Sequence, residues 1–123
     1  MTQKTQLREE DLIQFTGSEN WYRHSLFRNF LYTDGVQYLA EIGGAYWLID
    51  KIFSCHACVA KLEGEEFCVW DLNLKKDGQG ARLVCTDGND TGLYAENILF
   101  TDFPLKTIRL FFQNNTLLLP SEY

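Results

Sequence analysis

The chain has 123 residues, a mass of 14.3 kDa, 46% hydrophobic and 15% aromatic residues, and a net charge of −6 at pH 7. A chain of this length buries roughly two thirds of its unfolded surface, so we expect a single domain over residues 1–123. The acidic balance argues against nucleic-acid binding, and no apolar run approaches the ~20 residues of a membrane span. The first ten residues are polar and charged, unlike a signal peptide, so we expect a cytoplasmic protein.

The first half, about residues 1–60, shows mainly helical periodicity. A first helix is predicted from Leu7 to Phe15, because acidic residues near its start suit the helix dipole. Thr16 and Glu19 have the spacing of a capping box, which predicts a short second helix that carries Trp21 and Tyr22.

Residues 30–42 allow two interpretations. Asp34-Gly35 fits a hairpin turn, because the residues from Val36 to Ile42 alternate between apolar and polar types. Alternatively, Thr33 or Asp34 caps a helix. We favour the helix, because Gly43-Gly44 supplies a natural stop.

The clearest helix is predicted from Ala45 to about Ala57. Its apolar residues recur at the i, i+3, i+4, i+7 spacing of a buried stripe, which Trp47 widens. This stripe includes Ala45, Leu48, Ile49, Ile52, Phe53 and His56. We expect this helix to cover a sheet.

The second half, about residues 67–123, alternates with period two between turns rich in Gly and Asn. We therefore expect an α+β fold in which N-terminal helices pack on a C-terminal antiparallel β-meander of about five strands. The expected strands are 67–74, 81–86, 93–100, 105–112 and 116–119. Tight turns are predicted at Asp77-Gly78 and at Asn114-Asn115. Cys68, Trp70, Leu72 and Leu74 fall on one face of the first strand.

Four cysteines invite a redox or zinc interpretation, since Cys55 and Cys58 form a Cys-x-x-Cys pair. This pair lies at the C-terminal end of a predicted helix, where the dipole opposes thiolate formation. Cys68 and Cys85 do not form a second such pair. We therefore expect free, buried thiols.

Asp87-x-Asn89-x-Thr91-Gly92 resembles the opening of a calcium loop. Ile98 stands where the closing glutamate is required, so a polar turn is the preferred interpretation. We expect no cofactor and no metal.

Aromatic and ionisable residues are concentrated in Trp21-Tyr22-Arg23-His24, and Tyr32 lies close by in the sequence. These five residues are the candidate ligand- or partner-binding site. The chain lacks a nucleophile elbow, a phosphate loop and a paired-His helix motif, so no catalytic residue is proposed. His56 lies on an apolar stripe and is a poor candidate for a general base.

Several segments resemble a family of small bacterial proteins catalogued as a domain of unknown function. They are Glu-Asn-Trp-Tyr-Arg-His at 19–24, Tyr-Thr-Asp-Gly-Val at 32–36, Ala-Tyr-Trp-Leu-Ile-Asp at 45–50 and Leu-Pro-Ser-Glu-Tyr at 119–123. The resemblance implies a bacterial, cytosolic, single-domain protein of a kind often carried on mobile DNA. It implies no activity.

The leading hypothesis is a non-catalytic accessory or interaction protein that contacts a protein partner or self-associates. The aromatic content motivates it, because aromatic residues are enriched where proteins meet. We expect self-association at an edge strand near residues 117–119. The alternative is a small-ligand binder or enzyme with a pocket around Trp21, Arg23, His24 and Tyr32. A third possibility, an acidic mimic of nucleic acid, requires a stronger charge than −6.

Overall fold

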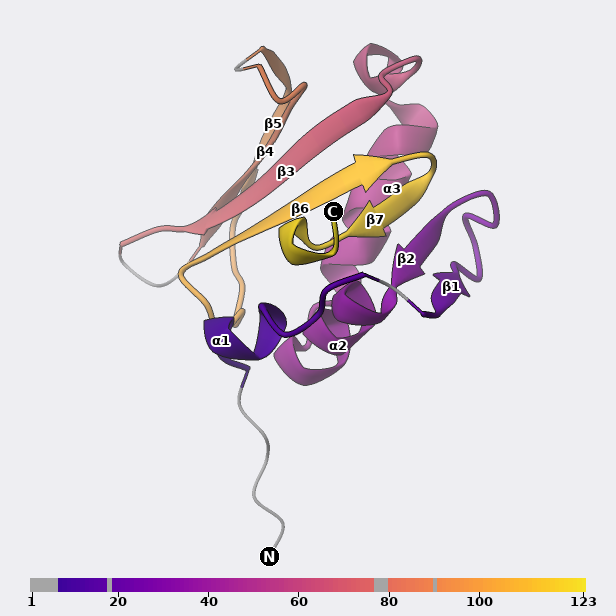
Figure 1. The fold of residues 1–123 in the computed structure, drawn as a ribbon. Coiled ribbons are helices and arrows are strands. Elements are labelled where there is room, and N and C mark those ends of the chain that lie inside the picture. Colours follow the sequence, from indigo (N-terminus) through magenta and orange to yellow (C-terminus); the bar gives the residue numbers. More distant parts are fainter. Residues whose placement is uncertain (1–6, 18, 77–79, 90) are drawn as a thin grey trace, which may run out of the picture.

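The computed structural model describes residues 7–17, 19–76, 80–89 and 91–123. Over these residues, seven strands form one mixed sheet in the order β1-β2-β7-β6-β3-β4-β5 (Figure 1). The β2 and β7 strands run parallel, and the other neighbouring strands run antiparallel. The strands are β1 (Trp21–Arg23), β2 (Leu31–Thr33), β3 (Phe67–Leu74), β4 (Ala81–Thr86), β5 (Gly92–Ile98), β6 (Thr107–Gln113) and β7 (Thr116–Leu118). The helical elements are α1 (Glu9–Leu12), α2 (Asp34–Gly43), α3 (Tyr46–Cys58) and the 3₁₀ turns η1 (Ala60–Leu62) and η2 (Pro120–Glu122).

Local sequence sets both ends of α2. The Thr33 hydroxyl accepts the N–H of Val36 at 3.4 Å and so caps the first turn. Gly44 ends the helix with a left-handed φ of 63°, a conformation that glycine adopts without steric cost. The helical interpretation of residues 34–43 is therefore confirmed, as is the long helix predicted from Ala45 and observed as α3.

The core lies between α2 and α3 and one face of the sheet (Figure 1). Alternate residues of the strands point into it, and Phe53 of α3 and Trp70 of β3 are 0% and 1% exposed. The opposite face, here called the open face, carries the remaining side chains of each strand, which alternate with those of the core. The C-terminal turn η2 lies on the open face (Figure 1). Beside it, the ring of Tyr123 contacts those of Phe67 and Phe111.

The predicted architecture, N-terminal helices on a C-terminal antiparallel meander of about five strands, is wrong. The N-terminal half contributes β1 and β2 to the sheet, and β2 pairs in parallel with β7 from the C-terminus. The error has a physical cause: each of these strands has only three residues, too few to show a period of two.

Two further N-terminal predictions are also wrong. The helix predicted over 7–15 is a single turn, Glu9–Leu12, and the segment with Trp21 and Tyr22 is a strand rather than a short helix. Part of the predicted capping box, Ser18, lies outside the described residues, as does the predicted turn at Asp77-Gly78. The turn at Asn114-Asn115 is confirmed, with φ of 53° and 57°.

The outer strands of the sheet are β1 and β5. The segment predicted to be an exposed edge, residues 117–119, belongs mainly to β7, which lies between β2 and β6, and Leu117 is 0% exposed. Across the part of the chain that the structure describes, none of the helices has the length and apolar character needed to cross a membrane.

Candidate functional site

The five predicted site residues fall on two faces of the sheet. Trp21 lies toward the open face, where it lines a depression of about 250 Å³ with Thr33 and Leu118. Arg23 follows the same alternation and donates a hydrogen bond to the Arg28 carbonyl. Tyr22 points to the helical face instead, where its ring stacks on that of Tyr32 at 5.5 Å between centroids.

His24 is held at both ring nitrogens. Nδ1 accepts the N–H groups of Leu26 and Phe27, each at 3.0 Å, so the ring proton of the neutral form belongs on Nε2. Nε2 lies 2.6 Å from the Asp50 carboxylate, which accepts this proton's hydrogen bond. The ring packs beside Phe27 and Phe53. His24 therefore anchors the β1–β2 connection to α3, because its ring binds Leu26 and Phe27 on one side and Asp50 on the other.

Asp34 joins the start of α2 to β1. Its carboxylate accepts the Tyr22 hydroxyl at 3.1 Å and the N–H groups of Glu19 and Asn20 at 3.3 and 3.1 Å. Desolvation raises the pKa of Asp34, but the hydrogen bonds from Asn20 and Tyr22 outweigh it and hold the pKa below its ordinary value. The same contact raises the pKa of Tyr22. This carboxylate is a structural acceptor.

Glu122 joins the other side of α2 to the C-terminus. Its carboxylate accepts the Thr33 hydroxyl at 2.7 Å, the Leu119 N–H at 2.9 Å and the Gly35 N–H at 3.1 Å. The side chain is 9% exposed and sits at the positive end of the α2 dipole. Asp34, Asp50 and Glu122 thus connect the four segments that carry the family resemblance.

His56 is a half-buried residue that packs against the core. Its ring stacks on Phe112 at 3.7 Å, and its Nε2 accepts the indole N–H of Trp70 at 3.0 Å. Burial lowers the pKa of His56 to about 4, so the ring is neutral at pH 7.

The prediction of free, buried thiols is confirmed for Cys55, Cys68 and Cys85 and is wrong for Cys58, which is free but exposed. Burial raises the pKa of Cys55, and the hydrogen bond with Cys68 together with burial raises that of Cys85. Asp87 accepts the N–H groups of two residues in its own turn, Asn89 and Thr91, at 2.8 and 3.3 Å. Among the described residues, no three His, Cys, Asp or Glu side chains gather in a geometry that suits a metal ion.

A cleft opens on the open face, between α1, β3, β6 and η2, and is here called the α1 cleft. Its volume of about 540 Å³ falls within the range of small-ligand and peptide-anchoring pockets. Apolar side chains in and directly next to α1 and η2 form its walls, and polar side chains of β3 and β6 form its floor. The lining residues are Glu9, Leu12, Ile13, Asp71, Asn73, Thr107, Ile108, Arg109, Leu119, Pro120 and Ser121.

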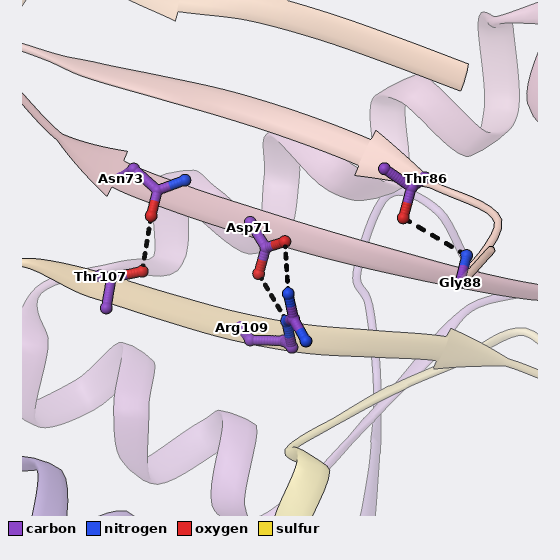
Figure 2. Close-up of polar contacts among 6 residues, drawn as sticks. All are labelled: Asp71, Asn73, Thr86, Gly88, Thr107 and Arg109. Atoms are coloured by element: carbon purple, nitrogen blue, oxygen red, sulfur yellow. Dashed lines mark hydrogen bonds and ion pairs between the residues drawn. The ribbon is translucent and has the colours of Figure 1, made fainter. Parts of the chain in front are cut away.

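The floor of the α1 cleft consists of two cross-strand pairs (Figure 2). Arg109 donates from Nε and Nη2 to the two oxygens of Asp71 at 2.8 and 3.1 Å, and this contact raises the pKa of Arg109. Beside this pair, the Thr107 hydroxyl donates to Asn73 Oδ1 at 2.7 Å. At the wall, the Ser121 hydroxyl donates to a carbonyl of α1 and so ties η2 to α1.

The residues of the α1 cleft form no recognisable motif in the sequence. Its one usable signal was the alternation of β3, which places Asp71 and Asn73 on the face opposite Trp70. The partner residues Thr107 and Arg109 lie more than thirty positions later in the chain, and η2 is a single turn without periodicity. Pairing across such distances depends on the sheet order, which the sequence pattern does not specify.

A family model described as "Family of unknown function (DUF6876)" matches residues 6–123. Neither a curated protein nor a solved structure matches the chain.

Proposed function

This chain belongs to that family of unknown function, and we propose that it is a non-catalytic interaction module that holds a peptide segment of a partner protein in the α1 cleft. The single observation that carries the proposal is the cleft itself, a concave site with apolar walls and a polar floor.

The walls favour an apolar side chain as the anchor. Ile13 is 68% exposed, although it borders the buried residues Leu12 and Leu119. An exposed apolar side chain at the rim of a concave site gains free energy when a partner covers it. Leu12 and Leu119 belong to the core, so a ligand would meet a wall that is already rigid.

The floor has donors that suit a peptide main chain. Arg109 uses two of its five N–H groups for Asp71, which leaves the others directed away from that carboxylate. The Asn73 side chain uses its oxygen for Thr107, so its amide N–H groups are free to donate to a carbonyl. These donors match the acceptors of an extended peptide.

Charge favours a basic segment. Asp71 and Arg109 compensate each other, whereas Glu9 at the cleft has no ion-pair partner among the described residues. The site therefore carries one uncompensated negative charge, within a chain whose net charge is −6. We expect the bound segment to combine an apolar anchor with a neighbouring Lys or Arg.

The placement of the reactive side chains supports a non-catalytic role. His24 is engaged at both ring nitrogens, and His56 is a neutral, half-buried ring whose Nε2 accepts the indole N–H of Trp70. Neither imidazole borders the α1 cleft. The interactions of both rings are those of structural residues rather than of a general base.

A displayed random-peptide library, selected on the wild-type protein, tests the proposal. Enriched peptides are expected to pair an apolar residue with Lys or Arg. Ile13→Asn is expected to weaken their binding about tenfold or more, because an apolar anchor contributes about 1.5–3 kcal/mol. The matched control is Leu26→Asn, because Leu26 is similarly exposed, at 74%, but lies in the β1–β2 connection. Fluorescence anisotropy with labelled peptides measures the dissociation constants.

The charge preference has its own test in Glu9→Lys, with Glu66→Lys as the control. The first variant is expected to reject basic peptides and the second to bind them as the wild type does. Equal binding by wild type and Ile13→Asn would contradict the proposed site, and enrichment without basic residues would contradict the charge argument.

A further inference from the structure

The strand β5 forms one edge of the sheet, and its outer side has no neighbouring strand among the described residues. We propose that β5 pairs antiparallel with β5 of a second copy of this chain, so that two sheets join across a two-fold axis and cover Leu99 and Phe100. This inference is independent of the α1 cleft, since β5 contributes none of its lining residues.

Exposed apolar side chains mark this edge. Leu99 and Phe100 directly follow β5 and are 88% and 77% exposed, the highest values among the large apolar residues of the described chain. A single exposed apolar residue is ordinary on a protein surface. Two consecutive ones directly after an open strand lie beside the position that a paired second copy would take, so pairing would cover them in part.

The register of β5 with β4 shifts at Leu93, close to the start of the strand, and the regular stretch from Tyr94 to Ile98 has no proline and no uncompensated charge. Edge strands are commonly protected by proline or by uncompensated charges. Residues 92–98 contain no proline, lysine or arginine. The charged side chain in the strand is Glu96, which has Lys51 Nζ at 3.2 Å and the Tyr94 hydroxyl at 2.7 Å. Two β5 edges can therefore meet without facing like charges.

The other edge of the sheet, β1, differs from β5 in length and in charge. The β1 strand has three residues and includes Arg23, which is exposed. Just before β1, the N–H groups of Glu19 and Asn20 are bound by Asp34 and are not free to pair with a second chain. Self-association by strand pairing is therefore assigned to β5 and not to β1.

A second copy fits β5 because the strand is self-complementary about its middle. Ala95 is the central residue of Gly92–Ile98 and has the small side chain that close approach at a two-fold axis requires. In that register, Tyr94 of each copy lies opposite Glu96 of the other, so hydroxyl faces carboxylate. Leu99 and Phe100 of each copy then extend toward the turn that precedes β5 in the other copy.

Sedimentation equilibrium from micromolar to millimolar concentration tests the proposal. The wild type is expected to show a monomer–dimer equilibrium, and the double variant Leu99→Asp/Phe100→Asp to raise the dimer dissociation constant at least tenfold. Both side chains are exposed, so the thermal unfolding of this variant is expected to match that of the wild type. Leu26→Asp is the matched control and should dimerise as the wild type does.

A cross-link tests the register. In a background with Cys58 replaced by serine, Ala95→Cys is expected to form a disulfide-linked dimer under mild oxidation, because Cβ atoms of directly opposed strand residues lie about 4.5–5.5 Å apart. Leu26→Cys should not. A wild type that remains monomeric at millimolar concentration, or a double variant that dimerises as tightly as the wild type, would overturn the proposal. Cross-linking of Leu26→Cys but not of Ala95→Cys would overturn the register and with it the β5 interface.

Discussion

Replacing Gly35 by alanine is expected to lower the free energy of unfolding by about 3 kcal/mol, because the new methyl group would overpack a closed site. A Cβ at this position would lie 2.5 Å from Leu119 Cδ1 and 2.6 Å from Glu122 Oε1. Glu122 has little room to withdraw, since its carboxylate accepts hydrogen bonds from Thr33, Leu119 and Gly35 itself. The alanine would displace the carboxylate from the start of α2.

Glu122→Ala is expected to cost about 3–4 kcal/mol. The substitution leaves the Thr33 hydroxyl and the N–H groups of Gly35 and Leu119 without their buried acceptor, and each unsatisfied group costs about 1–3 kcal/mol unless water reaches it. It also removes a negative charge from the positive end of the α2 dipole. Glu66→Ala is the matched control, because Glu66 is exposed, and a change of about 0.5 kcal/mol or less is expected there.

The two substitutions are expected to be non-additive. In the Glu122→Ala background, Gly35→Ala should cost less than it does alone, because the carboxylate that it displaces is already absent. Urea unfolding of the four proteins, followed by circular dichroism, measures the interaction free energy. Strict additivity, or a Gly35→Ala protein as stable as the wild type, would show that Glu122 does not hold α2 and η2 together.

The second large effect concerns acid. The pKa of His56 is about 4 in the folded protein, against 6.5 for an exposed histidine. Between these values, the unfolded chain binds a proton that the folded chain excludes, so acidification favours unfolding. This contribution is fully present above pH 6.5 and is lost as the pH falls to about 4. The loss has an upper limit of about 3.5 kcal/mol, from about 1.4 kcal/mol for each unit between 6.5 and about 4, and solvent screening of the half-buried ring makes it smaller.

His56→Gln separates this contribution from other acid effects. The glutamine amide oxygen is able to accept the Trp70 indole N–H but does not titrate. The variant is therefore expected to be less stable than the wild type at pH 7, because the stacking on Phe112 is lost, yet to lose less stability between pH 7 and pH 4. Urea unfolding at each pH gives both profiles. Parallel profiles would contradict the assignment, because the carboxylates titrate equally in both proteins.

The elements with enough residues to repeat a pattern were predictable. The strand Phe67–Leu74 was predicted with its observed bounds, and the stripe of α3 identified its buried face. Capping by Thr33 and the left-handed turn at Asn114-Asn115 depend on a few adjacent residues, which explains why the sequence shows them. The placement of His56 on an apolar stripe predicted that its ring packs against the core, where it contacts Phe112 and Trp70, although the residue is only half-buried.

Short elements depended on contacts made far away in the chain. The strands β1, β2 and β7 have three residues each. In the described part of the chain, the β1–β2 pair joins the rest of the sheet only through the parallel pairing of residues 31–32 with residues 116–117. A segment of three residues has too few local interactions to fix its own conformation, so its partner decides it. The same holds for Glu122, because the Gly35 N–H and the Thr33 hydroxyl that donate to its carboxylate lie 87 and 89 positions earlier.

The candidate site also depends partly on local sequence and partly on contacts between distant residues. The sequence by itself determined that this protein is small, acidic and rich in aromatic residues, and it determined which strand residues share a face. Only the tertiary structure brought Asp71 opposite Arg109, placed α1 and η2 as walls beside them, and left β5 rather than residues 117–119 at the edge. The reason is that the hydrophobic periodicity of a segment shows only which of its own side chains share a buried face. The order in which strands pair depends on the free energy of the whole packed sheet, to which residues from both ends of the chain contribute together.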